Sequence, residues 1–115
     1  MNYFKERITA IGYALAGCRA AFVTEAHLKL EVVMAIAVLL LGWYCDLTKT
    51  EWFMIAGCIT LVLCLELFNS ALEKLCDLVY PQPHPTIKYV KDVAAGAVLL
   101  ACVFSAIIGA IIFLF

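Results

Sequence analysis

The chain has 115 residues, of which 66% are hydrophobic and only 15% are charged. This composition excludes an ordinary soluble domain, because long uncharged stretches of this kind are typical of segments buried in a lipid bilayer. The formal net charge of −1 says little about partners, and we expect no nucleic acid among them. The sequence therefore predicts one all-α integral membrane domain over residues 1–115.

Residues 3–24 are predicted to form an amphipathic helix that lies in the membrane interface. Its apolar side chains recur every three or four residues, which is the helical period; they are Phe4, Ile8, Ile11, Leu15, Cys18 and Phe22. Basic residues beside such an apolar stripe are typical of a helix that lies flat on a membrane surface. The small residues Gly12, Ala16 and Ala20 would allow another helix to approach closely.

Three membrane-spanning helices are predicted to follow, at about 28–46, 51–74 and 90–115. The last contains the uncharged run Val93–Phe115, which is long enough to cross a hydrocarbon core about 30 Å thick. The uncharged runs of the first two are shorter. These two helices reach spanning length only if Glu31 and Glu66 lie near an interface or inside a bundle of helices.

The two loops between the spans indicate the orientation of the chain. The loop 46–51 contains a single lysine, whereas the other Lys and Arg residues lie in the N-terminal segment or around the second loop. Positive residues concentrate on the cytoplasmic side of membrane proteins. We therefore expect the N-terminus and the 75–91 loop in the cytoplasm and the C-terminus outside. All three prolines lie in Tyr80–Pro85, which is expected to be a stiff, non-helical elbow.

Polar side chains share one face at the cytoplasmic end of the second predicted span. At about 100° per residue they fall within an arc of roughly 100°; they are Glu66, Asn69, Ser70, Glu73 and Asp77. A charged residue at the centre of a membrane helix costs about 2.5–3.5 kcal/mol, so such residues are functional candidates. The first and third spans are expected to add further polar residues to the same layer, namely Glu25, His27, Lys29, Glu31, Lys91 and Asp92.

This set of residues favours phosphoryl transfer. Several carboxylates with lysine, and no Cys/His cluster, indicate a hard cation with oxygen ligands, such as Mg²⁺ on a polyphosphate. Phosphoryl transfer also needs a base at the attacking hydroxyl. Glu66 is the candidate base, and its expected depth indicates a membrane lipid alcohol as the acceptor. The alternative is a small transporter or channel subunit that uses Glu66 to carry protons or cations, although transporter sites typically lie near the midplane.

The six cysteines and two histidines show no metal-binding spacing. Most of the cysteines lie in apolar segments, where a thiol packs as a small hydrophobic group, so we interpret them as packing residues. His27 is interpreted as a solvated interfacial residue and His84 as a loop residue. A nucleotide contact is left open for both histidines and for Arg7.

The run Glu66-Leu-Phe-Asn-Ser-Ala-Leu-Glu73, followed later by Lys91-Asp92-Val-Ala-Ala-Gly-Ala-Val, resembles the prokaryotic diacylglycerol kinase and undecaprenol kinase family. The resemblance covers nearly the whole chain and includes Gly12-Tyr13 and Glu25 at matching spacing. It implies a homotrimeric bundle in the bacterial inner membrane, in which each subunit has an interfacial helix and three spans. The activity that it implies is the ATP- and Mg²⁺-dependent phosphorylation of a lipid alcohol.

The resemblance also implies roles for individual residues. Glu66 matches the catalytic base, and Glu25 and Glu73 match the carboxylates that hold Mg²⁺ on ATP. The implied nucleotide contacts are Tyr13, Glu25, Asn69, Glu73, Lys91 and Asp92, and the implied substrate contacts are Glu31, Glu66 and Asn69. Two lipids remain open as the acceptor. The His84-Pro85 loop and the run 91–98 resemble the undecaprenol kinase branch, which is slightly favoured, whereas Glu31 resembles the diacylglycerol kinase branch.

Overall fold

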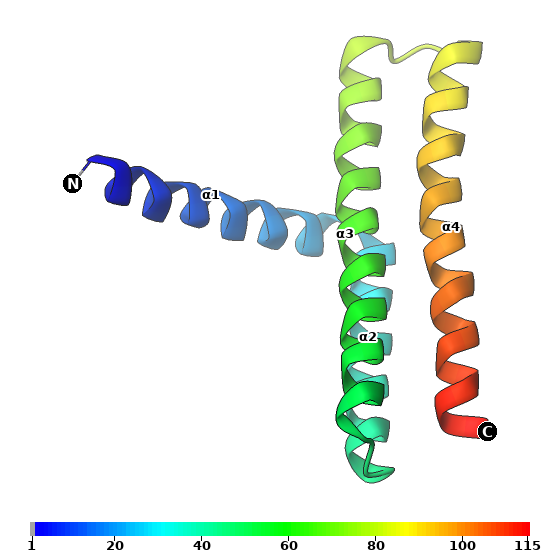
Figure 1. Ribbon diagram of the computed structural model, residues 1–115. Helices are drawn as coiled ribbons and strands as arrows, with labels where there is room; N and C mark the ends of the chain where they lie inside the picture. Colours follow the sequence, from blue (N-terminus) through cyan, green and yellow to red (C-terminus); the bar gives the residue numbers. More distant parts are fainter. Residues whose placement is uncertain (1) are drawn as a thin grey trace.

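Four helices make up nearly all of the chain in the computed structural model, which describes residues 2–115 (Figure 1). They are α1 (Asn2–Thr24), α2 (Ala26–Tyr44), α3 (Lys49–Val79) and α4 (Pro85–Leu114), and residues 2–115 contain no β-strand. The helices α2, α3 and α4 are each long and apolar enough to cross a membrane. The structure therefore confirms an all-α chain with one further N-terminal helix and three potential spans.

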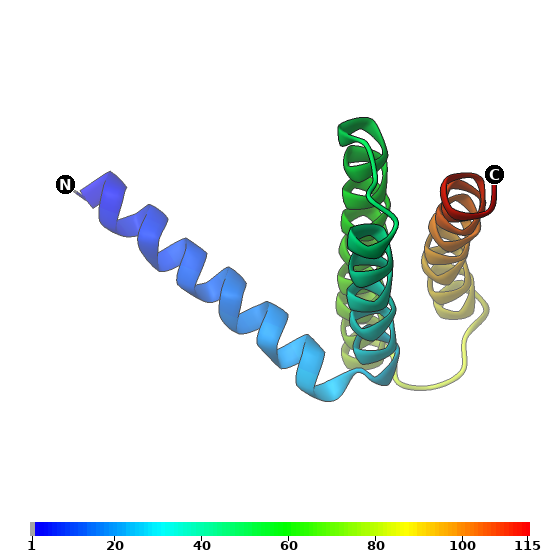
Figure 2. The same ribbon diagram turned by 90° about the horizontal axis from the view of Figure 1, so that it is seen from below.

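The three long helices lie alongside one another, and α1 projects away from them. α3 packs against both α2 and α4, and α3 and α4 run antiparallel (Figure 1). Figure 2 shows α1 leaving the other helices on one side. The molecule is consequently broad and thin, with extents of 48 × 47 × 21 Å. None of the α1 side chains is buried, so its apolar stripe is free to contact lipid or another protein chain.

A buried stripe along α3 positions the helices around it. In the half of α3 nearer Lys49 the stripe consists of Ile55, Cys58 and Val62, which are 3–9% exposed. Their spacing of three and four residues places these side chains on one face of the helix. The same face continues with Glu66 and Ser70, which are 9% and 8% exposed. The buried face of α3 is therefore wholly apolar in one half, whereas in the other half it carries the polar Glu66 and Ser70 as well as Cys76.

Both α3 and α4 extend further toward the proline-rich turn than the spans expected at 51–74 and 90–115. α3 continues to Val79, and α4 begins at Pro85. Proline is tolerated at the first position of a helix, where its missing N–H would have no intrahelical partner. The Nδ1 atom of His84 caps α4 by accepting a hydrogen bond from the Thr86 N–H (3.1 Å). The prediction that Pro85 is non-helical is therefore wrong, and the non-helical turn covers residues 80–84.

The polar groups of the turn between α2 and α3 are paired with one another. α2 ends at Tyr44 rather than at residue 46, because Asp46 adopts a left-handed conformation (φ 56°) that cannot continue a right-handed helix. Thr48 Oγ1 accepts a hydrogen bond from the Glu51 N–H (3.2 Å), and Glu51 Oε1 accepts one from the Thr48 N–H (3.0 Å). This reciprocal capping box fixes the start of α3.

Close packing at Gly42 closes the same end of the bundle. A Cβ atom at this position would lie 2.9 Å from side-chain atoms of both Leu47 and Trp52. Only glycine therefore lets the indole ring approach the α2 backbone this closely. The Trp52 side chain thus packs the start of α3 against α2.

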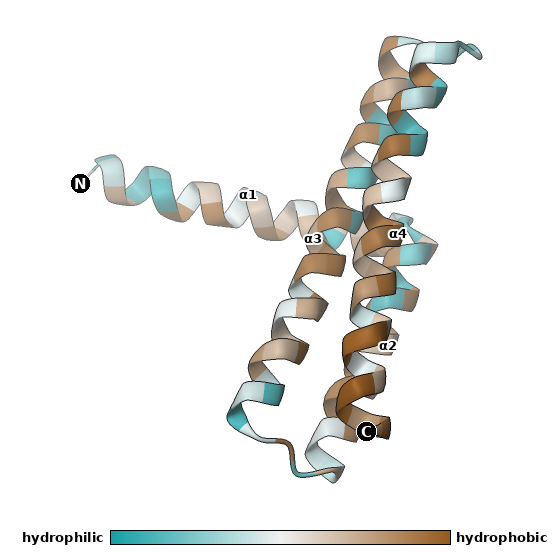
Figure 3. Ribbon diagram, turned by 45° about the vertical axis from the view of Figure 1, so that its right-hand side comes forward, coloured by the Kyte–Doolittle hydropathy of each residue, from teal (hydrophilic) through white to brown (hydrophobic). Residues whose placement is uncertain are grey.

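The level at which α1 leaves the bundle divides α3 into two parts. α1 meets α3 around Leu67 and Ala71, roughly midway along α3 in Figure 1. Between Lys49 and Glu66, α3 rises about 26 Å, which is close to the hydrocarbon thickness of about 30 Å. If α1 lies in the membrane interface, Glu66 would therefore lie at the depth of that interface. Figure 3 shows hydrophobic residues along the C-terminal half of α4 and hydrophilic ones where α1, α2 and α3 meet.

Candidate functional site

Glu66 is the buried carboxylate at the centre of the candidate site. It continues the buried face of α3 and is only 9% exposed. Four titratable groups lie close enough to act on its charge, namely Glu31, His27, Glu73 and Glu25. Within residues 2–115 no ion pair neutralises Glu66. The structure thus brings acidic residues from the start of α2 and from α3 together around a carboxylate that forms no ion pair in the described chain.

Asn69 and Glu73 form the next part of this face, one and two helical turns beyond Glu66. Asn69 Nδ2 donates a hydrogen bond to Glu73 Oε1 (3.3 Å). The carbonyl oxygen of the same amide, Asn69 Oδ1, is buried and has no hydrogen-bond partner within residues 2–115. A buried oxygen without a partner is costly, because water no longer solvates it. The Asn69 amide therefore offers a free acceptor to a ligand.

A cavity of about 500 Å³ lies between α1 and α3. Its walls come from the end of α1 and from the middle of α3, and the polar residues among them are Thr24, Glu25, Ser70 and Lys74. Tyr13 does not line this cavity and is 75% exposed. Within one chain, the structure therefore places Glu25 beside the buried face of α3 but leaves Tyr13 outside the site.

A second cavity, a groove of about 260 Å³, runs between α2 and α4 over the surface of α3. Its walls are almost entirely apolar, and Glu31, Cys102 and Ser105 are the exceptions. Glu31 Oε1 lies 4.0 Å from Cys102 Sγ, and Ser105 Oγ is buried without a partner in the described chain. Glu31 lines the groove and also lies close enough to Glu66 to act on its charge. The groove therefore extends from the polar residues around Glu66 into the apolar part of the bundle.

Small residues recur every four positions along α4, at Ala101, Ser105 and Gly109, and such a face can pack closely against another helix. Ala101 is only 4% exposed. Because α4 contacts α3 within the described chain, Ala101 packs against α3. Ser105 and Gly109 instead line the groove. A Cβ atom at Gly109 would meet nothing within 4 Å. The small residues therefore keep this part of the groove open.

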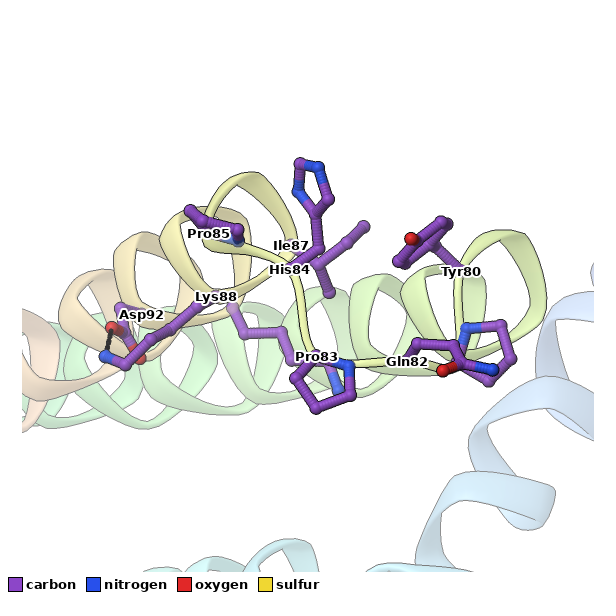
Figure 4. A pocket seen from close by; sticks show the side chains of 10 residues that line it. Tyr80, Gln82, Pro83, His84, Pro85, Ile87, Lys88 and Asp92 are labelled. Carbon is purple, nitrogen blue, oxygen red and sulfur yellow. Dashed lines mark hydrogen bonds and ion pairs between the residues drawn. The ribbon is translucent and has the colours of Figure 1, made fainter.

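Both of the predicted site residues at the start of α4 are held in ion pairs. Lys91 Nζ lies 2.6 Å from Asp77 Oδ1 of α3, and Lys88 pairs with Asp92 one turn further along α4 (Figure 4). Glu73 also lies close enough to act on the charge of Lys91. Lys91 is therefore connected, within one chain, to the polar face of α3.

A third cavity of about 670 Å³ lies at the turn between α3 and α4 (Figure 4). The rings of Tyr80 and His84 line it and meet edge to face, with their centroids 5.2 Å apart. Lys88 and Lys91 also line it. The loop was predicted from the sequence, but this cavity was not.

The oxygen donors near Glu66 fit Mg²⁺ carried by a nucleotide. Residues 2–115 contain no group of three or more His, Cys, Asp or Glu side chains that could enclose a metal ion. Mg²⁺ usually needs only one or two carboxylates, together with phosphate oxygens and water. Glu25 and Glu73 both lie near Glu66, and the Asn69 amide oxygen without a partner belongs to the residue that is bonded to Glu73.

The ion pairs of α4 were not predicted from the sequence. The spacing of four residues between Lys88 and Asp92 is a sequence signal for a pair on one helix. No comparable signal exists for Lys91 and Asp77, because their contact depends on how α3 and α4 face each other across the turn.

Most of the chain is similar in sequence to known proteins. A family model described as prokaryotic diacylglycerol kinase matches residues 12–113. An undecaprenol kinase of Bacillus subtilis is 42% identical over 91 residues, which cover 79% of this chain and 74% of the relative. A diacylglycerol kinase of Synechocystis is 36% identical over 103 residues, covering 89% of this chain but 59% of that longer protein. A diacylglycerol kinase of Escherichia coli is 29% identical over 104 residues, covering 90% and 85%.

These matches decide between the two classes of function that the sequence left open. The relatives are lipid kinases, and the family model covers all three potential spans almost completely. The protein is therefore a membrane lipid kinase rather than a transporter or channel subunit. The chain belongs to the prokaryotic diacylglycerol kinase family.

Proposed function

We propose that this kinase transfers the γ-phosphoryl group of ATP to a membrane lipid alcohol, with Glu66 as the general base and undecaprenol as the favoured acceptor. The observation that carries this proposal is the placement of Glu66. It is a buried carboxylate without an ion-pair partner in the described chain, at the level where α1 meets α3. A lipid hydroxyl at the surface of the hydrocarbon core lies at the same depth.

In the proposed reaction, Glu66 acts on the hydroxyl group of the lipid. The Glu66 carboxylate accepts the proton of the lipid hydroxyl as the hydroxyl oxygen attacks the γ-phosphorus. The new O–P bond forms while the bond between the γ-phosphorus and the β–γ bridging oxygen breaks, so ADP leaves with that oxygen. The products are the lipid phosphate, ADP and a proton, which Glu66 releases to water.

Residues on α1, α3 and α4, together with Glu25 between α1 and α2, would hold the nucleotide. Glu25 and Glu73 are the proposed Mg²⁺ ligands, and Mg²⁺ on ATP neutralises negative charge on the phosphates. The Asn69 amide has a free oxygen in the same region. Lys91 is the proposed donor to the γ-phosphate, and Asp92 and Tyr13 are further proposed nucleotide contacts.

Two observations support undecaprenol as the favoured lipid. The groove between α2 and α4 is lined almost entirely by apolar residues and reaches Glu31, so it offers a path for a hydrocarbon chain whose hydroxyl lies near Glu66. The undecaprenol kinase of Bacillus subtilis is 42% identical to this chain, whereas the diacylglycerol kinases above are 36% and 29% identical.

We also propose that the working unit is a homotrimer in the bacterial inner membrane, with the N-terminus and the 75–91 loop in the cytoplasm. α1 buries none of its side chains within its own chain, and Tyr13 lies outside the site of that chain. A neighbouring subunit would cover these surfaces and bring Tyr13 to a nucleotide. Analytical ultracentrifugation in detergent micelles should therefore give the protein mass of three chains.

Labelled phosphate transfer tests the function. Purified protein in mixed micelles receives γ-labelled ATP and Mg²⁺ with undecaprenol, with diacylglycerol, or with no lipid. We expect label in the lipid fraction, faster with undecaprenol, and none in the absence of lipid or after chelation of Mg²⁺. Preferential labelling of diacylglycerol would overturn the lipid assignment, and a failure to label either lipid would overturn the kinase reaction proposed here.

A further inference from the structure

The contact between Asp77 and Lys91 is the one ion pair that joins two helices within residues 2–115. Asp77 lies near the end of α3, and Lys91 lies two turns into α4. The two charged atoms are 2.6 Å apart, which is the length of a strong charge-assisted hydrogen bond. The pair therefore ties the two helices together on the side of the proline-rich turn.

From this contact we infer that Asp77 is a positioning residue, which holds the Lys91 ammonium group where it meets the γ-phosphate. This inference rests on the proposed role of Lys91 in the kinase reaction. A lysine side chain has four rotatable bonds and points in no fixed direction when it is free in solvent. The carboxylate of Asp77 restricts Lys91 to the space between α3 and α4, beside Glu73, which also acts on its charge.

The pair does not occupy all of the donors of Lys91. A lysine ammonium group has three N–H donors and no acceptor. Asp77 takes one of them, and two stay available for phosphate oxygens. Asp77 can therefore orient the ammonium group and remain bonded to it while the nucleotide is bound, so the pair supports phosphate binding instead of competing with it.

No other carboxylate of the described chain holds Lys91 in this way. Asp92 is adjacent to Lys91 in sequence but pairs with Lys88. Glu73 acts on Lys91 electrostatically without forming an ion pair with it. Loss of the Asp77 carboxylate would therefore release Lys91. The side chains of Lys91 and Asp77 are 37% and 61% exposed. Loss of the Asp77 carboxylate should therefore disturb the position of the Lys91 ammonium group without disturbing a buried core.

The test is a double-mutant cycle on turnover. We expect Asp77→Asn to lower kcat about fivefold, the upper range for an exposed ion pair, and to leave KM for ATP nearly unchanged. In a Lys91→Gln background the same substitution should have no further effect, because the group it orients is gone. Asp77→Glu, which keeps a carboxylate, should recover turnover toward the wild-type value.

Asp46→Asn is the matched control. It makes the same chemical change at the opposite end of the bundle, and asparagine tolerates the left-handed conformation found there. Helix content by circular dichroism shows that each variant is folded.

Other results would overturn either the role of Asp77 or the role of Lys91. Equal losses from Asp77→Asn with and without Lys91, or equal losses in the Asn and Glu variants, would overturn the positioning role and leave the kinase assignment intact. The same holds if Asp77→Asn turns over at the wild-type rate. Full activity of Lys91→Gln would instead refute the proposed role of Lys91, and with it the role of Asp77.

Discussion

The two halves of α3 show how one helix face serves two purposes. In the half near Lys49, the buried face is apolar, and the capping box of Thr48 and Glu51 pairs the exposed polar groups at its start. In the other half, the buried face carries Glu66 and Ser70, and a buried oxygen of Asn69 has no partner in the described chain. Polar groups satisfied by their neighbours indicate a structural region, and buried polar groups without partners indicate a ligand site.

The strongest test of this contrast is the exchange of glutamate for glutamine in each half of α3. Glu66→Gln should lower phosphoryl transfer about 10²–10⁴-fold, the usual contribution of a general base, because an amide cannot accept the proton. Glu51→Gln makes the same change in the other half and should stay active, since glutamine also serves at this position of a capping box.

Initial rates with labelled ATP measure both variants, and circular dichroism shows that each is folded. A Glu66→Gln enzyme that kept more than about a tenth of the wild-type rate would lack the effect of a general base. The polar half of the buried face would then have a structural role as well.

The carboxylates around Glu66 should affect the use of Mg²⁺. Glu25→Gln and Glu73→Gln each replace a proposed carboxylate ligand by a neutral amide, which holds Mg²⁺ more weakly. The Mg²⁺ concentration for half-maximal activity should rise about tenfold or more, since loss of even an outer-shell partner typically costs about 10–100-fold in metal affinity. Titration of MgCl₂ at fixed ATP measures the shift, with Glu51→Gln as the control. An unchanged midpoint in both variants would mean that these residues do not bind the metal.

Filling the groove between α2 and α4 should weaken lipid use without affecting ATP. A side chain at Gly109 would meet no atom near its Cβ, so Gly109→Phe can extend into the groove without backbone strain. We expect KM for the lipid to rise about tenfold, with KM for ATP constant. If both constants stay at the wild-type values, the lipid chain lies elsewhere.

Removal of the cap in the apolar half should have the smallest effect and should act on stability alone. Thr48→Ala deletes the hydroxyl that accepts from the Glu51 N–H, and loss of such a cap costs about 1 kcal/mol. Unfolding with dodecyl sulfate in mixed micelles measures this change. Turnover under stabilising conditions should match the wild-type rate, and a large loss of turnover would show that the two halves are not independent.

The helices could be predicted from the sequence because their signals are local. The uncharged runs and the helical spacing of the α1 stripe depend only on neighbouring residues, and the structure confirms four helices. The helix ends were harder to predict. Pro85 reads as a helix breaker, yet proline fits the first position of a helix when His84 provides the cap.

The site could be predicted only in part, because its contacts join different helices. The spacing of Glu66, Asn69 and Glu73 places them on one face, and the structure shows the Asn69–Glu73 hydrogen bond that this spacing allows. The contact between Lys91 and Asp77 depends on the rotation of α4 relative to α3. No pattern within either helix contains that information.

The rise of α3 between Lys49 and Glu66 bears on how this kinase would respond to the thickness of its membrane. That rise, about 26 Å, is fixed by the helix, whereas the hydrocarbon thickness of bilayers varies by several Å and a rigid helix must tilt or deform the lipid to match it. If Glu66 is the base proposed above, a thick bilayer would place it below the level of the lipid hydroxyl and a thin one would place it above. The length of α3 would then match Glu66 to one range of membrane thickness.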